Sequence, residues 1–461
     1  KGEQSILNDD SAHINPLKPA HFLQVCTYYP DIQGVIYLWG MVKNELDLIQ
    51  NPDHFILLSQ ACSGFLHVTQ ALIANKINPG LWNITCATAS IHEQIIPLMA
   101  PLVGMGKTLL LEHPDFFYQH IDVSQNESPE QIANLLLDSI VNKKNSSFMA
   151  YEKGVMYLQR LRPANMPSDS FSEQLLQDAT YLITGGLGGI GTIVRQWLLS
   201  HKVKSIVLIG RKALNPQIIA QIDSNKTADT QISYIQADVT QYSQLEAVLK
   251  KIDKEQPPIK GIFHTAGILK DASWEQLSWD ACEQVFAAKI TGTWNLHRVS
   301  MDYAPHLKFF VLFSSISSEL GSPGQANYAG ANAYMDALAH YRIQNGLPAL
   351  SINWGPWDNI GMSQNLRPFW QDYGIDSITN NLGLRALNLI LSKERQIAFI
   401  PNHVTREKIA LLPPIYQSIL KNLIAKDTFQ KTGGVFLEDE EVAASSVSKQ
   451  KGQGIVIQKE Q

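Results

Sequence analysis

The feature of this sequence that most constrains its fold is a strand, a glycine-rich loop and a helix in immediate succession over residues 180–200, TYLITGGLGGIGTIVRQWLLS. Gly186, Gly188 and Gly191 have the Gly-x-Gly-x-x-Gly spacing of a dinucleotide-binding turn. Glycines allow the tight turn and the close approach of the backbone to a phosphate, and the helix N-terminus that follows favours an anion. The sequence therefore predicts a parallel α/β sheet that binds a dinucleotide here.

The apolar runs that follow end in residues suited to other parts of a dinucleotide. The first ends in Arg211 and Lys212, where an NAD enzyme would prefer an acidic residue for the ribose hydroxyls. This cationic pair suits the 2′-phosphate of NADP, with Arg211 the better candidate for a forked contact; a solvated basic turn is the alternative. A later run ends in Asp238 and Val239, placed to contact adenine, and the run 261–267 ends in small residues. The expected NADPH-binding residues are Thr184, Gly185, Gly186, Leu187, Gly188, Gly189, Ile190, Arg211, Lys212, Asp238, Val239, Thr265, Ala266 and Gly267.

A candidate reaction centre lies in residues 308–334, KFFVLFSSISSELGSPGQANYAGANAY. An apolar run ends in Ser314 and Ser315, and a Gly/Ser/Pro turn then leads into a helix that carries Tyr328 and Asn332 on one face. A hydroxyl at the carboxyl end of a strand, beside a tyrosine on the next helix, is where open α/β sheets place their active sites.

The first half of the chain alternates strand-like and helical runs, which predicts a second parallel sheet. The strands are expected at 34–40, 81–87 and 147–161, and the helices at 55–75 and 129–142. No glycine fingerprint follows any of these strands, because Gly104 and Gly106 form only a short Gly-Met-Gly. We expect this half to be a scaffold that binds no dinucleotide.

Composition excludes several other classes of function. The 461 residues carry a formal net charge of −5 without a basic block, which argues against nucleic acid as the main partner. The four cysteines are scattered without metal-ligand spacing, as expected of buried apolar residues in the cytoplasm. No apolar run is expected to reach the roughly 18 residues of a membrane span. The chain begins at Lys1 without a signal-peptide pattern, and we expect a piece of a longer protein.

These patterns predict an α/β fold with two Rossmann-like subdomains, the first truncated and the second a catalytic, doubly wound parallel sheet. The expected boundaries are a linker over 1–20, the scaffold over 21–170, the reductase over 171–425 and a disordered linker over 426–461.

Nearly the whole chain resembles the ketoreductase domain of modular polyketide synthases, within the short-chain dehydrogenase/reductase superfamily. The motifs that carry this resemblance are TGGLGGIG, LIGRK, FHTAGIL, AAKITGTWNLH, FSSISS, GQANYAGANAYMDALA and INWGPW.

The resemblance implies four catalytic residues. Simple reductases of the superfamily have lysine four residues after the tyrosine, but Asn332 stands there, and Lys289 matches the lysine that polyketide ketoreductases supply from an earlier helix. Tyr328 is then the expected general acid, with a pKa lowered by Lys289, and Ser315 holds the substrate oxygen. Ser314 is the rival of Ser315, which lies at the family's spacing of thirteen residues before the tyrosine.

The resemblance also implies a stereochemical class. Family members that form D-alcohols carry Leu-Asp-Asp where this chain has Leu269, Lys270 and Asp271, so that the middle acid is lost. The opposite class has tryptophan at the place of Leu320. The residues expected at the substrate are Leu269, Asp271, Leu320, Pro323, Asn327 and Met362, which opens a mobile lid. A D-β-hydroxyacyl product is expected.

The implied function is NADPH-dependent reduction of a β-ketoacyl group held on the phosphopantetheine arm of an acyl carrier protein, among neighbouring synthase domains. The alternatives are a redox-inactive epimerase or a structural docking module. A free-standing metabolic reductase is disfavoured by the scaffold half.

Overall fold

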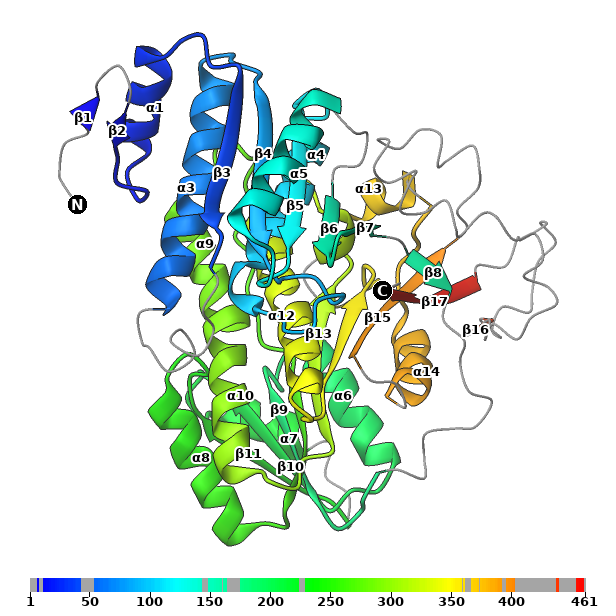
Figure 1. Ribbon diagram of the computed structural model, residues 1–461. Helices are drawn as coiled ribbons and strands as arrows, with labels where there is room; N and C mark the ends of the chain where they lie inside the picture. The colour runs from blue at the N-terminus through cyan, green and yellow to red at the C-terminus, as the bar shows by residue number, and fades with distance from the viewer. Residues whose placement is uncertain are drawn as a thin grey trace.

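Seven parallel strands form the main part of the largest sheet in this computed structural model, a sheet of ten described strands whose other three are antiparallel (Figure 1). The structure describes residues 6–7, 11–42, 54–142, 148–159, 161–163, 175–223, 229–358, 360, 366–372, 374–391, 395–402, 437–438 and 453–459. The strand order is β11-β10-β9-β12-β13-β14-β15. The bounds are β9 Thr180–Thr184, β10 Ser205–Gly210, β11 Gln231–Gln236, β12 Ile259–His264, β13 Phe309–Ser315, β14 Leu350–Trp354 and β15 Arg395–Asn402. Most positions of the central strands are buried, because helices cover both faces.

The strand order of this sheet reverses between β9 and β12. From β9 the chain moves outward through β10 and β11, and then crosses back to place β12 on the other side of β9. Such a reversal leaves a crevice at the carboxyl ends of the two strands, where open α/β sheets bind their ligands. The helices of this half are α6 Gly189–Ser200, α7 Pro216–Asp223, α8 Tyr242–Glu255, α9 Trp279–Phe286, α10 Gly292–Tyr303, α11 Ser317–Leu320, α12 Ala326–Gln344, α13 Arg367–Asp372 and α14 Asn380–Ile390.

The smaller sheet has five strands in the order β3-β4-β5-β6-β7 and no such reversal. Each strand is added on the same side of the one before it, with the last pair antiparallel. The five strands of the first half therefore have no switch-point crevice, which, together with the lack of a glycine loop, is why we expect this half to be a scaffold. Its elements are α1 Pro19–Tyr28, β3 Gly34–Gly40, α3 His54–Ala74, β4 Gly80–Cys86, α4 Pro101–Glu112, β5 Tyr118–Val123, α5 Pro129–Asn142, β6 Phe148–Glu152 and β7 Val155–Leu158. The expected fold class, α/β with two sheets, is confirmed.

Both segments expected to be linkers contain paired strands. In the first twenty residues, β1 (Ile6–Leu7) pairs with β2 (Ala12–His13). Near the end of the chain, β17 (Gln453–Lys459) pairs antiparallel with β15 and also with β8 (Leu161–Pro163). The structure thus differs from the expected disordered segment at 453–459, where Gly-Ile-Val-Ile supplies a short β-prone run that composition averaged over 426–461 conceals.

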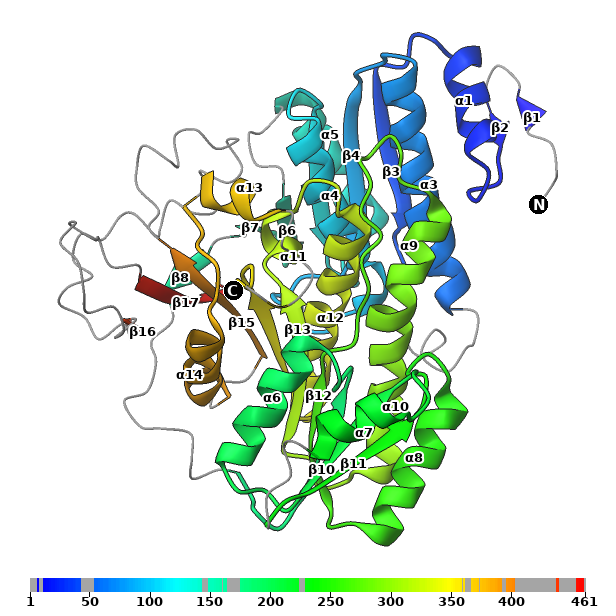
Figure 2. The same cartoon turned by 180° about the vertical axis from the view of Figure 1, so that it is seen from behind.

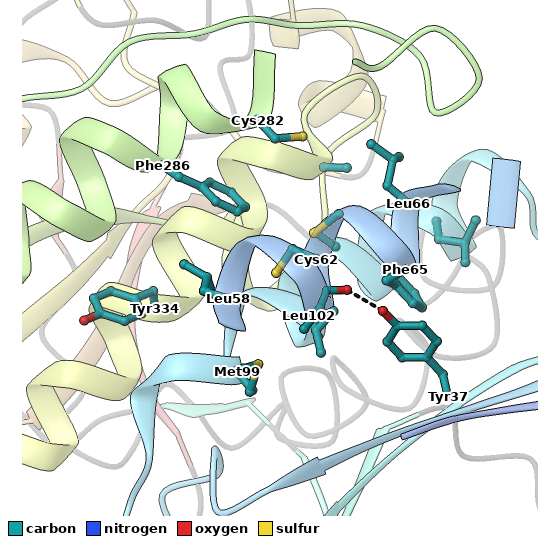
Figure 3. Close-up of a cluster of buried hydrophobic side chains, with 14 of the residues drawn as sticks. Tyr37, Leu58, Cys62, Phe65, Leu66, Met99, Leu102, Cys282, Phe286 and Tyr334 are labelled. Atoms are coloured by element: carbon teal, nitrogen blue, oxygen red, sulfur yellow. Dashed lines mark hydrogen bonds between the residues drawn. The ribbon is translucent and has the colours of Figure 1, made fainter. Parts of the chain in front are cut away.

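One hydrophobic core joins the two halves. Figure 3 shows Cys62 and Phe65 of α3 and Leu102 of α4 in the same cluster as Cys282 and Phe286 of α9. The reverse view shows α9 and α10 beside α12, which lies between the two sheets (Figure 2). By length and composition alone, Phe55–Ala74 of α3 could cross a membrane, contrary to the expectation from sequence, but 61% of its apolar window is buried in the fold. Burial of this kind is typical of a core helix.

The Gly-Met-Gly of the first half lies inside α4, where it brings two helices together. A Cβ on Gly104 would lie 2.5 Å from the carbonyl carbon of Ala329 on α12, and one on Gly330 would lie 3.0 Å from the Pro101 carbonyl oxygen. The backbones of α4 and α12 can approach this closely only because these positions lack side chains. Of the two glycines of this Gly-Met-Gly, Gly104 therefore serves the contact between the halves, whereas Gly106 packs against Tyr118 within the first half.

Gly104→Ala should destabilise the chain more than Gly106→Ala, the matched change two residues away. The new methyl group at 104 meets the α12 backbone, whereas at 106 it meets the hydroxyl end of the Tyr118 side chain, which has more freedom to move. We expect Gly104→Ala to lower the free energy of unfolding by about 1–3 kcal/mol, as overpacking does. Urea denaturation of both variants measures this, and an equal or smaller loss at 104 would contradict the tight backbone contact.

Candidate active site

The glycine loop joins β9 to α6 at the switch point. Gly185 has φ +70°, a conformation that side chains rarely adopt, and a Cβ on Gly191 would lie 2.5 Å from the Gly185 carbonyl oxygen. The helix begins at Gly189 after Gly188, which offers no side-chain cap. The first N–H groups of α6 have no intrahelical partner and form the positive end of the helix dipole, as an anion site requires.

A cleft of about 430 Å³ lies along this loop. Twelve of the fourteen residues predicted to bind the cofactor line it: Gly185, Leu187, Gly188, Gly189, Ile190, Arg211, Lys212, Asp238, Val239, Thr265, Ala266 and Gly267. Thr184 and Gly186 do not. Thr184 is buried, and its hydroxyl lies 2.6 Å from Nδ1 of His264, while a Cβ on Gly186 would meet Leu208.

The residues of this cleft fit a dinucleotide with a 2′-phosphate. The loop has no side chains where a pyrophosphate would approach the α6 N-terminus. Arg211 and Lys212 are exposed on the cleft wall at the end of β10, where the 2′ position of the adenosine would lie. Asp238 is held in place by its own turn, because its Oδ1 accepts a hydrogen bond from the Thr240 N–H at 2.9 Å.

A second, smaller cavity adjoins the cleft and shares Ile190 and Thr265 with it. Three of the four predicted catalytic residues line this cavity: Ser315, Tyr328 and Lys289. They come from the end of β13, the first turn of α12 and the segment between α9 and α10. The structure thus places the hydroxyls of Ser315 and Tyr328 beside the site that would hold a nicotinamide.

Lys289 lies in a π-helical turn, Ala287–Thr291, between α9 and α10. Its ammonium donates to the Phe313 carbonyl oxygen at 3.1 Å and to Asn332 Oδ1 at 2.9 Å, and lies 5.1 Å from the centroid of the Tyr328 ring. Asn332 Nδ2 in turn donates to the Tyr328 carbonyl oxygen at 2.8 Å. Asn332 therefore contacts both, and it fixes the lysine directly rather than through a water.

The pKa of Tyr328 differs from the expected direction. Burial raises it to about 12, against the opposing effects of the Asn332 and Ser315 side chains. Burial also lowers the pKa of Lys289 to about 7, although the Asp336 carboxylate opposes this. Desolvation dominates both groups, so the pKa of Tyr328 is raised where a lowered value was expected.

The structure separates the two candidate serines. Ser314 is buried, and its hydroxyl donates to the Asn332 carbonyl oxygen at 3.4 Å and accepts from Asn353 at 3.3 Å. Ser315 is only half-buried, and its hydroxyl accepts from the Ser317 N–H at 3.2 Å and also bonds to the Tyr328 side chain. This arrangement favours Ser315.

Asn353 and Asp336 form a buried hydrogen-bond network that holds the end of β13. Asn353 Nδ2 lies 3.2 Å from the Ser315 carbonyl oxygen and 2.8 Å from Asp336 Oδ2. The Asp336 carboxylate also accepts from the hydroxyls of Ser318 and Ser351, each at 2.5 Å. A buried carboxylate with three donors is well compensated for its loss of water.

The same network reaches the first half of the chain. Gln396 Nε2 donates to Asn353 Oδ1 at 2.9 Å and to Glu319 Oε1 at 2.6 Å. Lys107 of α4 then contacts Glu319 Oε2 at 3.3 Å and the Ser318 carbonyl oxygen at 2.8 Å. The scaffold half therefore supplies a buried cation to the segment that follows Ser315.

The residues predicted to contact the substrate differ in where the structure places them. Leu269 lines the smaller cavity, whereas Leu320 is buried and does not line it. The polar pair holds loops together: Asp271 accepts from Gln325 at 3.0 Å, and Asn327 donates to the Lys270 carbonyl oxygen at 2.9 Å. Pro323 is half-buried in the adjoining turn. Met362 and the start of the expected lid lie outside the described residues.

Sequence reasoning missed several residues of the cavity wall. Trp354, Trp357 and Trp370 form an aromatic part of it, and Gln325 lies near Tyr328. The sequence shows Trp354 and Trp357 within the motif INWGPW. It does not show that both line the cavity, which follows from their position at the end of β14 and just after it. Trp370 had no sequence signal, because it comes from the short helix α13.

Comparisons with known proteins agree with this geometry. Residues 179–359 match the family described as KR domain. One of the subunits of the phenolphthiocerol/phthiocerol polyketide synthase of Mycobacterium tuberculosis is 30% identical over 370 residues, which is 78% of this chain but 19% of the relative. Among solved structures, an A-type ketoreductase from a modular polyketide synthase matches with a TM-score of 0.73 at 26% identity, over 83% of this chain and 81% of that one. A C2-type ketoreductase matches with the same TM-score of 0.73 at 20% identity, over 86% of each chain, which shows the fold alone.

Lys289→Met should change how stability depends on pH. Unfolded lysine titrates at about 10.4, so between pH values of about 7 and 10 the unfolded chain binds more protons at Lys289 than the folded chain does. Wild-type stability therefore rises with pH in this window, by up to about 1.4 kcal/mol per pH unit from this group, and the variant lacks that rise. Urea titrations at several pH values in this window should show that the free energy of unfolding of the wild type increases relative to that of the variant as the pH rises. A constant difference would contradict the lowered pKa.

Proposed function

This chain is a KR domain, a ketoreductase of the polyketide synthase family, and we propose that it uses NADPH to reduce a β-ketoacyl group to a D-β-hydroxyacyl group. The observation that carries the proposal is the junction of the two cavities. The glycine cleft and the Ser315–Tyr328 cavity meet at Ile190 and Thr265, so that a hydride donor and a proton donor can reach one carbonyl group. The cofactor, when bound, supplies the hydride.

The side chains divide the remaining work. Ser315 donates its hydroxyl proton to the substrate oxygen and so orients the ketone beside Tyr328. Tyr328, kept protonated by its raised pKa, transfers the phenolic proton to that oxygen as negative charge develops there. Lys289, tied to Asn332 and lying against the Tyr328 ring, fixes the phenol and offers a cation once it is protonated. The three tryptophans of the cavity exclude water and provide an apolar wall for the acyl chain.

The carrier of the substrate and the configuration of the product alcohol are further parts of the proposal. The chain spans about a fifth of the length of the curated relatives it matches, which supports a β-ketoacyl substrate delivered by an acyl carrier protein among neighbouring synthase domains. The D hand rests on Asp271 and on Leu320 in place of tryptophan. Backbone likeness does not decide it, because the A-type and C2-type structures match with equal TM-scores.

Tyr328→Phe should lower turnover about a hundredfold or more, the usual contribution of a positioned general acid, while NADPH binding is kept. The assay follows the loss of NADPH absorbance with a β-ketoacyl thioester, with chiral analysis of the alcohol. Tyr341→Phe, on the same helix but outside the cavity, is the matched control. Full turnover by Tyr328→Phe would contradict the assignment. A wild-type chain that binds NADPH without turnover would instead be an epimerase, and one that binds no NADPH would be a docking module.

Arg211→Ala should raise the KM for NADPH at least about tenfold and leave the KM for NADH nearly unchanged, because a charge-assisted contact to the 2′-phosphate is lost. Steady-state kinetics with both cofactors measure the two values. An equal change in both would show that Arg211 does not recognise the 2′-phosphate.

A further inference from the structure

Two loops flank the Ser315–Tyr328 cavity, and direct hydrogen bonds connect them. Loop A is residues 268–276, after β12, and loop B is residues 318–325, between β13 and α12. The Ala272 N–H donates to the Gly324 carbonyl oxygen at 2.9 Å, and Gln325 Nε2 donates to Asp271 at 3.0 Å. Leu269 of loop A and Gln325 of loop B line the cavity, so the spacing of the loops sets the shape of that wall.

Helix α4 of the scaffold half holds both loops with one carboxylate. Glu112 Oε2 accepts from the Trp274 N–H of loop A at 2.7 Å, and Oε1 accepts from the Gly324 N–H of loop B at 3.0 Å. One turn earlier on the same face, Thr108 Oγ1 accepts from the Ser322 N–H at 3.2 Å. Gly104 continues this face and contacts the α12 backbone beside Tyr328. One face of α4 therefore contacts loop A, loop B and the first turns of α12.

Helix α3 anchors the same part of loop A. The indole of Trp274 is fully buried and donates to Thr69 Oγ1 at 3.0 Å, and Gln70 donates to the Trp274 carbonyl oxygen at 2.7 Å. The indole, the backbone N–H and the carbonyl oxygen of Trp274 thus all form hydrogen bonds with the scaffold half. Loop A is fixed to that half, and Glu112 is the side chain that bonds to both loops.

We propose that Glu112 is a positioning residue that selects the face of the ketone to be reduced, by fixing loops A and B relative to each other. The inference rests on the proposed reduction. With its oxygen held by Ser315 and Tyr328, a ketone can present its other face only if its two substituents exchange walls. Leu269 and Gln325 of the loops line part of this cavity, and Trp354, Trp357 and Trp370, which lie outside the two loops, line another part.

The experiment compares the D:L ratio of the alcohol formed by wild type, Glu112→Gln, Glu112→Ala and Glu112→Asp. The amide of Glu112→Gln can accept only one of the two hydrogen bonds and turns an NH₂ toward the other N–H. We expect the ratio to fall about fivefold or more for Gln and Ala, with turnover kept within about tenfold, and to recover in part for Asp, which keeps the carboxylate. Glu275→Gln is the matched control, because Glu275 is an exposed acid of loop A that contacts His113.

Hydrogen exchange of peptides from loops A and B gives a readout that needs no turnover. Both loops should exchange faster in Glu112→Gln and Glu112→Ala, and at the wild-type rate in Glu275→Gln. Wild-type turnover with an unchanged ratio in all Glu112 variants would overturn the selection role, whether or not exchange changed. An equal fall in the ratio for Glu275→Gln would overturn it too. If wild type shows no turnover, the proposed reduction fails. Unchanged hydrogen exchange of loops A and B in the Glu112 variants would then also show that Glu112 does not fix the two loops. If Glu112→Ala does not fold, Glu112→Gln and Glu112→Asp decide.

Discussion

The contact between α4 and α12 is the constraint on which the site depends. Gly104 meets the backbone of Ala329 and Gly330, the two residues that follow Tyr328 in the chain. A helix that approaches another at backbone distance leaves little freedom to slide or rotate, because interiors are close-packed. The position of Tyr328 is therefore set by a helix of the half that has neither a glycine loop nor a switch point.

Buried charged side chains fix the relative position of the segments at this contact. Lys107, Glu319 and Asp336 are nearly inaccessible to water, and burying such groups is costly unless each finds partners. The glycine contact and the shared apolar core already join the halves, so adhesion does not require these charges. Instead, they fix a position. The hydrogen bonds that run from Lys107 through Glu319 and Gln396 to Asn353 are directional, and together they hold the segment that begins at Ser315 in one arrangement.

The sequence was informative where a local pattern fixes the structure. The glycine loop, the apolar strands and the residues at strand ends predicted the larger sheet and the place of its site, because carboxyl ends of parallel strands meet at one edge. Family resemblance then brought Lys289, Ser315, Tyr328 and Asn332 together. Contacts between distant segments were not predictable in this way. Gly104 was assessed only as a failed phosphate loop, and Thr184 could not be distinguished from its neighbours on the loop. The direction of the Tyr328 pKa depends on burial, which no spacing reveals.

The anchoring of loop A to α3 and α4 has a consequence for how such a domain can be moved between proteins. A graft cut at the start of β9 would carry the seven parallel strands and the four predicted catalytic residues. It would nevertheless leave the indole of Trp274, the N–H of Gly324 and the carbonyl group of Ser318 without the partners they have here. The smallest transplantable unit that preserves the geometry of the site therefore includes the helices of the first half.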